Sequence, residues 1–263
     1  MASKLVLVSG ASSGIGAATA TRYGRAGARV LLLARSAERL DRVVESIRQS
    51  GGAGDPYVID LADAAAIQET AARIKRERGT PDILINNAGA GRWLPLVETT
   101  ADDALRMIEV PYLAAFNLTR SFLPEMLERG SGSLAYVTSP ASFIAWPNAS
   151  AYIASRRAVA GLADTLRSEL KSTGVSVTLV VFGLVESGYW QHNPGSRERL
   201  PVSNPVLAPI LSCEEAAEAI FHGVEARKPM VVKPAILRAI FVLNALFPRL
   251  VARQLRHAVP KQS

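Results

Sequence analysis

Short apolar runs alternate with amphipathic stretches along residues 4–185. The runs are mostly continuous, as expected for strands that helices cover on both faces. This alternation predicts repeated strand–helix–strand units around a parallel sheet, so the expected fold class is α/β. The predicted strands are Leu5–Ser9, Val30–Ala34, Tyr57–Ile59, Ile83–Asn86, Ser133–Thr138, Val175–Phe182 and Met230–Val232.

Two helix starts carry local signals. Thr100 with Asp103, and Ser212 with Glu215, place an oxygen acceptor and an acid at capping-box spacing. This spacing predicts helices that begin near residues 101 and 213. Helices are expected to fill the remaining gaps between the strands.

Residues 186–211 contain four prolines and cannot sustain a regular element. The segment follows the carboxyl end of a predicted strand, where open α/β sheets bind ligands. A long loop at this place is either a substrate lid, which we favour, or a passive insertion.

Composition and charge limit the class of protein. A chain of 263 residues with 49% hydrophobic content can bury one large core, so we expect one domain over residues 1–263. The net charge of +7 arises in residues 226–263, which contain eight basic residues and no acidic one. A nucleic-acid-binding protein usually carries basic residues across a folded face, so this distribution argues against nucleic acid as a partner.

Cysteine and histidine are too scarce to suggest a disulfide or a metal site. Cys213 is the only cysteine, and His192, His222 and His257 lie far apart in the sequence. The chain begins almost at once with an apolar strand, without the features of a signal peptide. We therefore expect a cytoplasmic protein that holds no metal.

A glycine-rich turn follows the first predicted strand and opens the first helix. Its glycines permit a tight turn, and the free N–H groups at the helix start suit a pyrophosphate. The alternative is a tight turn without a ligand, but the strand–turn–helix order favours a dinucleotide site. The residues expected to contact the cofactor here are Gly10, Ser12, Ser13, Gly14, Ile15 and Gly16.

The end of the second strand indicates which dinucleotide is bound. An NAD site usually has an acid here, but this strand ends at Ala34 and is followed by Arg35. Arg35 could grip a 2′-phosphate with its planar guanidinium, which favours NADP(H), or it could be a solvated surface residue. Asp60, after the third strand, could accept from the adenine amino group or cap the helix that starts at Asp63.

The segment Asn86–Asn87–Ala88–Gly89 ends the fourth strand. Its amides could hold the glycine-rich loop and the nicotinamide ribose in register, or they could serve a turn of their own. We take Asn87, Ala88 and Gly89 as candidate cofactor contacts.

The order and spacing of these motifs resemble the short-chain dehydrogenase/reductase family. The resemblance spans about residues 4–185 and rests on the glycine-rich turn, the Asn86–Gly89 segment, Ser139, and Tyr152 thirteen residues later. It implies a Rossmann fold, with a doubly wound parallel sheet of about seven strands and helices on both faces. It also implies a homodimer or homotetramer, and Arg35 resembles the corresponding residue of the NADP-preferring members.

The resemblance implies roles for single residues as well. Tyr152 corresponds to the family's general acid or base, and Ser139 to the serine that holds the substrate carbonyl. Arg156 stands where the family has a lysine, and Pro111 where it has the asparagine of a proton relay. After the sixth strand, the implied cofactor contacts are Gly183, Val185 and Ser187.

Arg156 lies one helical turn after Tyr152 and decides how the site is interpreted. A free tyrosine has a pKa of about 10, so a phenolate at neutral pH needs a nearby cation. Arg156 supplies that cation and could reach ribose hydroxyls, but unlike lysine it does not release a proton. Pro111 would kink its helix while keeping a carbonyl that could hold a water. We favour a rerouted proton supply; the alternative is lost redox chemistry, with Arg156 and Arg157 forming a basic helix face.

The C-terminal segment 234–258 is apolar at first and basic at its end. Ala235–Phe247 is too short to span a bilayer, but with the three arginines that follow it could lie on an anionic membrane surface. It could also pack across a subunit interface or over the pocket, which we favour slightly. Either arrangement suits an apolar substrate. The residues expected at the pocket mouth are Trp93, Leu94, Phe143, Trp146, Tyr189 and Trp190.

Together these features predict an NADP(H)-dependent oxidoreductase, either a ketoreductase or an alcohol dehydrogenase, that acts on an apolar carbonyl or secondary alcohol. Ser139, Tyr152 and Arg156 are its expected catalytic residues. A non-redox enzyme of the same fold, such as a dehydratase, isomerase or cyclase, is the first alternative. The second is a cofactor-binding protein that has lost redox activity.

Overall fold

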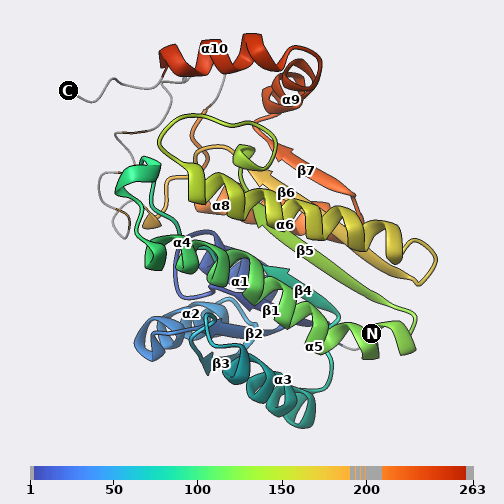
Figure 1. The fold of residues 1–263 in the computed structure, drawn as a ribbon. Helices are drawn as coiled ribbons and strands as arrows, with labels where there is room; N and C mark the ends of the chain where they lie inside the picture. The colour runs from blue at the N-terminus through green and yellow to red at the C-terminus, as the bar shows by residue number, and fades with distance from the viewer. Residues whose placement is uncertain (1–2, 190–192, 194–195, 197–198, 200–208, 259–263) are drawn as a thin grey trace.

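Seven parallel strands form one sheet in the computed structural model, which describes residues 3–189, 193, 196, 199 and 209–258 (Figure 1). The strands lie in the order β3-β2-β1-β4-β5-β6-β7, which confirms the predicted doubly wound α/β fold. Their bounds are β1 (Leu5–Ser9), β2 (Arg29–Ala34), β3 (Ala53–Val58), β4 (Ile83–Asn86), β5 (Gly132–Thr138), β6 (Val175–Phe182) and β7 (Met230–Lys233).

Helices cover both faces of this sheet, as the continuous apolar strands predict. The main helices are α1 (Gly14–Arg25), α2 (Ala37–Gln49), α3 (Ala64–Arg78), α4 (Ala101–Ile108), α5 (Ala114–Glu128), α6 (Ser150–Glu169), α8 (Cys213–Glu225), α9 (Ile236–Leu246) and α10 (Pro248–Ala258). Buried side chains of α3, α5 and α6 pack on one face of the sheet, and those of α1, α2 and α8 pack on the other. The core is therefore two apolar layers that hold the sheet between them.

Both predicted helix starts are confirmed. The Thr100 hydroxyl accepts from the Asp103 N–H at the start of α4. At the start of α8, Ser212 and Glu215 form a complete capping box, since each side chain accepts from the other residue's N–H. These caps fix where the helices begin, and each helix follows a segment that lines the cavity described below.

The strand β3 differs from its prediction. The expected strand was Tyr57–Ile59, but β3 begins at Ala53 and includes Gly54, Asp55 and Pro56, which are poor strand formers. The edge position explains the difference, because β3 pairs only with β2 and a proline is tolerated on an edge strand. Pairing with β2 therefore overrides the local preference of these residues.

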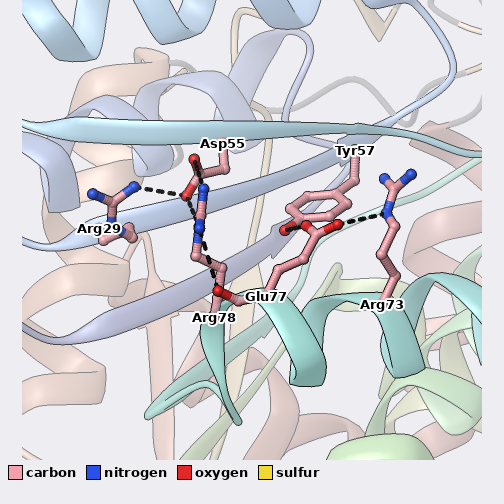
Figure 2. A network of polar contacts seen from close by, with 6 residues as sticks. All are labelled: Arg29, Asp55, Tyr57, Arg73, Glu77 and Arg78. Atoms are coloured by element: carbon pink, nitrogen blue, oxygen red, sulfur yellow. Dashed lines mark hydrogen bonds and ion pairs between the residues drawn. The ribbon is translucent and has the colours of Figure 1, made fainter.

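Charged side chains join β2 and β3 to α3 beside this edge of the sheet (Figure 2). Asp55 accepts hydrogen bonds from Arg29 at 2.9 Å and from two nitrogens of Arg78 at 2.9 and 3.0 Å. Burial raises the pKa of Asp55, but the hydrogen bonds from Arg78 and Arg29 outweigh it and hold this pKa below the usual value. Burial and the hydrogen bond to Glu77 raise the pKa of Tyr57 to about 12. The network therefore places charged side chains next to the edge strand β3, where they disfavour pairing with further strands.

Pro111 interrupts the helical path between α4 and α5, as predicted. The chain makes one π-helical turn over Glu109–Leu113, and Pro111 is buried within it. Because proline lacks an N–H, it cannot continue the α-helical ladder, and the Ala114 N–H bonds instead to the Glu109 carbonyl, one residue further back.

The last two helices, α9 and α10, lie together at one end of the molecule, beside the β7 edge of the sheet (Figure 1). Asn244 of α9 donates to the Phe143 carbonyl at 3.0 Å, and Phe241 packs on Phe143 with ring centroids 4.7 Å apart. Across the described ranges, no helix is long and apolar enough to cross a bilayer.

Candidate active site

A cavity of about 1050 Å³ opens at the carboxyl ends of the strands. Every cofactor contact and catalytic residue predicted from the sequence lines it. These are Gly10, Ser12, Ser13, Gly14, Ile15, Gly16, Arg35, Asp60, Asn87, Ala88, Gly89, Ser139, Tyr152, Arg156, Gly183, Val185 and Ser187. The loops that follow β1 to β6 thus converge on one site, as the parallel topology requires.

The glycine-rich turn after β1 has no room for a side chain at Gly10 or at Gly16. A Cβ on Gly16 would lie 2.2 Å from the Gly10 carbonyl oxygen. Gly10 itself has a φ of +68°, and a Cβ there would lie 2.9 Å from the Cα of Ala88. The backbone of this turn therefore forms the wall of the cavity.

Asn87 and Ser9 hold this turn against the end of β4. The Asn87 side-chain amide donates to the Ser9 carbonyl at 3.1 Å and to the Gly10 carbonyl at 3.4 Å. In return, the Ser9 hydroxyl accepts from the backbone N–H groups of Asn87 and Ala88, both at 3.0 Å. The predicted role of Asn87 in keeping the glycine-rich loop in register is confirmed, while its contact with a ribose stays a prediction.

The first turn of α1 is suited to an anion. Within the described part of the chain, the Ser13 side chain makes no capping hydrogen bond. Ser13, Gly14, Ile15 and Gly16 line the cavity, so backbone N–H groups at the positive end of the helix face it.

Two arginines line the cavity where β2 ends. Arg35 follows Ala34 directly, as predicted, and Arg39 lies in the first turn of α2, whose N-cap is Ser36. Sequence reasoning missed Arg39. The signal was available, because a serine cap after Arg35 places the residue three positions later on the first helical turn.

Asp60 lines the cavity, and the alternative role of capping the helix is wrong. Asp63 caps α3 by accepting from the N–H groups of Ala65 and Ala66. Among the residues that the structure describes, the Asp60 carboxylate accepts only from the Ala62 N–H, at 3.1 Å. Its carboxylate can therefore serve a ligand.

Ser139, Tyr152 and Arg156 come from two neighbouring elements. Ser139 directly follows β5, where its hydroxyl accepts from the Ala141 N–H at 3.2 Å. Tyr152 and Arg156 lie on α6 and are each only 6% exposed. The guanidinium carbon of Arg156 is 4.8 Å from the centroid of the Tyr152 ring, a cation–π distance.

The burial of Arg156 argues against the alternative that Arg156 and Arg157 form an exposed basic helix face. Arg157 is exposed, but Arg156 points into the protein and donates to the Ala90 carbonyl at 3.4 Å. Its Nε is fully buried and has no hydrogen-bond partner among the described residues. A Cβ on Gly89 would lie 3.0 Å from the Arg156 Nη2, so glycine leaves space for the guanidinium. A buried N–H group that lacks a partner is costly, so the Nε of Arg156 is typical of a group that meets a ligand.

Aromatic rings surround Tyr152. Trp93 packs between Tyr152 and Trp146, with centroid distances of 5.3 and 5.1 Å. Tyr189 donates to the Gly91 carbonyl at 2.8 Å, and burial, followed by the neighbouring Tyr152, raises its pKa well above the ordinary value. The cavity wall beside Tyr152 is therefore formed largely by aromatic rings.

The predicted pocket mouth is partly confirmed. Trp93, Trp146 and Tyr189 line the cavity, but Leu94 and Phe143 do not. Phe143 instead packs under α9, which no local signal in the sequence could show. Trp190 lies outside the described residues.

Only parts of the segment 186–211 belong to the described residues. Leu211 at its end forms a parallel bridge with Val185, the residue directly before the segment. Between them, Ser196 accepts from the Trp93 N–H at 3.1 Å, and Arg199 donates to the Trp93 carbonyl at 3.0 Å. These contacts bring the segment to the aromatic wall of the cavity.

The C-terminal helices close another part of the cavity. Leu237 and Ile240 of α9 and Leu255 of α10 line it. The expectation that the segment 234–258 packs over the pocket is confirmed for these residues. Sequence analysis did not single them out, because their contacts depend on how the helices fold back over the sheet.

Residues 4–197 match the family model of the short chain dehydrogenase. The chain therefore belongs to the short-chain dehydrogenase family. It is 30% identical over 256 residues to a protein described as probable oxidoreductase EphD from Mycobacterium tuberculosis. That alignment covers 93% of this chain but only 43% of EphD, so the chain spans less than half the length of this relative.

Solved structures are similar over nearly the whole chain. A short-chain dehydrogenase from Sphingobium yanoikuyae in complex with NADPH has a TM-score of 0.80 at 27% identity, covering 98% of this chain and 99% of that chain. A variant of actinorhodin polyketide ketoreductase with NADPH has a TM-score of 0.79 at 28% identity. That match covers 89% of this chain and 97% of the ketoreductase.

Proposed function

We propose that this protein is an NADP(H)-dependent oxidoreductase that reduces an apolar carbonyl compound or oxidises the matching secondary alcohol. One observation carries the proposal: Ser139, Tyr152 and Arg156 share a single cavity with the glycine-rich turn. A dinucleotide bound at that turn would extend along the cavity toward Tyr152, as the crevice of this fold favours.

The shape and charge of the cavity fit the proposed cofactor. The glycine-rich turn and the N-terminus of α1 suit a pyrophosphate, because this group needs a close approach of the backbone and N–H donors. Arg35 and Arg39 suit a 2′-phosphate, and Ala34 offers no carboxylate for an unmodified ribose. The NADPH complexes of the two similar structures support the same choice. A ribose hydroxyl would also satisfy the buried Nε of Arg156.

The catalytic roles follow from chemistry and position. The bound nicotinamide supplies or accepts the hydride. Tyr152 donates a proton to the carbonyl oxygen during reduction, and Ser139 donates a hydrogen bond that polarises this oxygen. Arg156 stabilises the negative charge left on the Tyr152 oxygen, because its cation is permanent and buried close by.

Arg156 does not release protons, so the proton on Tyr152 must be restored by another route. The π-helical turn at Glu109–Leu113 packs against α6, and we expect a backbone carbonyl of this turn to hold a water. We propose that the proton relay to Tyr152 runs through this water. Pro111 has no N–H, so its backbone can contribute only the carbonyl as an acceptor.

The substrate side of the cavity is apolar. Trp93 and Trp146 form one wall, and Leu237, Ile240 and Leu255 form another. This lining favours a substrate with a hydrophobic body around one carbonyl group. The segment 186–211 would act as its lid, because Ser196 and Arg199 already contact Trp93.

A carbonyl screen tests this function. Purified protein is mixed with NADPH or NADH and a panel of aliphatic, cyclic and aromatic ketones, and cofactor oxidation is followed by absorbance. We expect oxidation of NADPH by apolar ketones, with NADH used less well. Tight NADPH binding without oxidation by any ketone or reduction of NADP by any alcohol would reject the proposal.

A further inference from the structure

We infer that α9 and α10 form a docking face for the surface of an anionic lipid bilayer. We define the docking face as the exposed apolar residues Val242, Leu243, Leu246, Phe247 and Leu250 together with Arg249, Arg253 and Arg256. The inference concerns an interaction surface and does not depend on the proposed redox chemistry.

Helix α9 is apolar on two opposite faces. Its inward face carries Leu237 and Ile240, which line the cavity, and Asn244, which bonds to the Phe143 carbonyl. Its outward face carries Val242 and Leu246, which are 60% and 66% exposed although they lie one helical turn apart. A surface helix normally carries polar residues on its outer face, so this outer stripe points to a partner.

The apolar surface continues past the end of α9. Phe247 joins the two helices and is 56% exposed, and Leu250 on the first turn of α10 is 50% exposed. Together with Val242 and Leu246 they gather four exposed apolar side chains within residues 242–250. Exposed apolar side chains gathered in this way mark interaction sites.

Three arginines border the patch. Arg249, Arg253 and Arg256 have the spacing of one helix face, and all three are exposed. In the described structure, none of them pairs with a carboxylate, whereas the exposed arginines Arg42, Arg48 and Arg78 each do. On the other side of α10, Val251 is buried and Leu255 lines the cavity. The helix is therefore amphipathic, with its basic side turned outward.

The positive charge of the docking face indicates what binds to it. Residues 226–263 contain no acidic side chain, so a second copy placed face to face would bring its arginines against these arginines. An apolar stripe beside unpaired arginines instead matches the interface of a bilayer, where acyl chains lie beneath anionic headgroups. The patch is too short to span, which agrees with lateral docking.

Vesicle binding tests the docking face. The full chain is sedimented with vesicles of phosphatidylcholine alone and with vesicles that also contain phosphatidylglycerol. We expect binding only to the anionic vesicles, because each arginine near an anionic surface contributes about fivefold in affinity. The double variant Arg249→Glu/Arg253→Glu should lose at least about 25-fold in binding.

A matched control changes the same charge elsewhere. Arg76 on α3 and Lys171 after α6 are exposed and form no ion pair within the described structure. The variant Arg76→Glu/Lys171→Glu should bind anionic vesicles almost as the original chain does. If both pairs weaken binding equally, net charge alone drives it and the docking face is wrong.

A second variant tests the apolar part. Leu246→Asn/Phe247→Asn keeps the charge and changes side chains that are mostly exposed, so folding should persist, as circular dichroism can show. We expect it to abolish vesicle binding while heparin binding is unchanged. Two results would overturn the inference: no binding of the original chain to anionic vesicles, or a concentration-dependent dimer that these substitutions dissociate in the absence of lipid.

Discussion

The β1–α1 turn forms its wall of the cavity from backbone, whereas α6 forms the opposite wall from aromatic and charged side chains. At the turn, a single added methyl on Gly16 would clash with the Gly10 carbonyl at 2.2 Å. At α6, Arg156 occupies a position where the family resemblance leads one to expect lysine, and the structure accommodates its guanidinium beside Gly89 and Tyr152.

This difference separates two kinds of constraint. The turn is restricted by shape, because no side chain fits at Gly10 or Gly16 whatever its chemistry. The α6 wall is restricted by charge, because any buried cation near Tyr152 can stabilise a phenolate. Arg156 supplies the buried cation, but unlike lysine it cannot exchange a proton. We assign the proton supply to a water near the π-helical turn.

The largest effect should come from the α6 wall. Tyr152→Phe keeps the ring that packs on Trp93 but removes the proposed proton donor. We expect kcat to fall by about 10²- to 10⁴-fold with NADPH binding unchanged. Tyr189→Phe serves as the control, since it removes the neighbouring hydroxyl. If Tyr189→Phe is the more damaging change, the proton donor has been assigned to the wrong tyrosine.

Arg156 separates the need for charge from the need for proton exchange. Arg156→Met should lower kcat by about 10²-fold, because the Tyr152 oxygen loses its buried cation. Arg156→Lys should stay within about tenfold of the original kcat, since the charge is kept. Steady-state kinetics at neutral pH measure both variants. A large gain with lysine would mean that arginine handicaps the site, and no loss with methionine would mean that charge is not required.

The shape constraint at the turn predicts a loss of stability. Gly16→Ala should cost about 1–3 kcal/mol in the free energy of unfolding and abolish NADPH binding, because the new methyl displaces the Gly10 backbone. Gly161→Ala is the matched control, because a Cβ added to this exposed helical glycine would meet no neighbouring atom within 4 Å. It should stabilise the protein slightly. Urea unfolding of the two variants checks the contrast, and equal behaviour would contradict it.

The smallest effect should come from the β3 edge, away from both cavity walls. Asp55 has a lowered pKa, so its ion pairs stabilise the fold fully above the unfolded pKa of about 3.9 and are lost as pH falls through the lower folded value. Asp55→Asn should therefore lower stability by about 1 kcal/mol or less at pH 7, and the gap should close in acid. Thermal melts across this pH range measure it. A gap that widens in acid would contradict the assignment.

The sequence predicts the strands best where burial is continuous. The bounds of β1, β4 and β6 match their predictions, because a continuous apolar run that is buried on both faces marks where a strand begins and ends. The strand β3 is the exception, since Gly54, Asp55 and Pro56 form a strand only through pairing with β2. Edge pairing is a tertiary effect that local preference does not contain.

The candidate site divides in the same way. Gly10 and Asn87 can be predicted because each lies in a short motif at the end of a strand, and Tyr152 because its separation from Ser139 resembles the family pattern. Leu237 and Leu255 reach the cavity only because the C-terminal helices fold back over it. Such contacts join segments distant in the sequence, and an apolar helix alone does not reveal what it covers.

The fate of the hydride tests the central claim most directly. The protein is incubated with an accepted ketone and NADPH that carries deuterium at the transferable position of the nicotinamide, and the product is analysed by mass spectrometry. We expect an alcohol that carries one deuterium, with one NADP formed for each alcohol. A product formed without deuterium, or turnover without net oxidation of NADPH, would contradict the proposed oxidoreductase and favour a non-redox enzyme of the same fold.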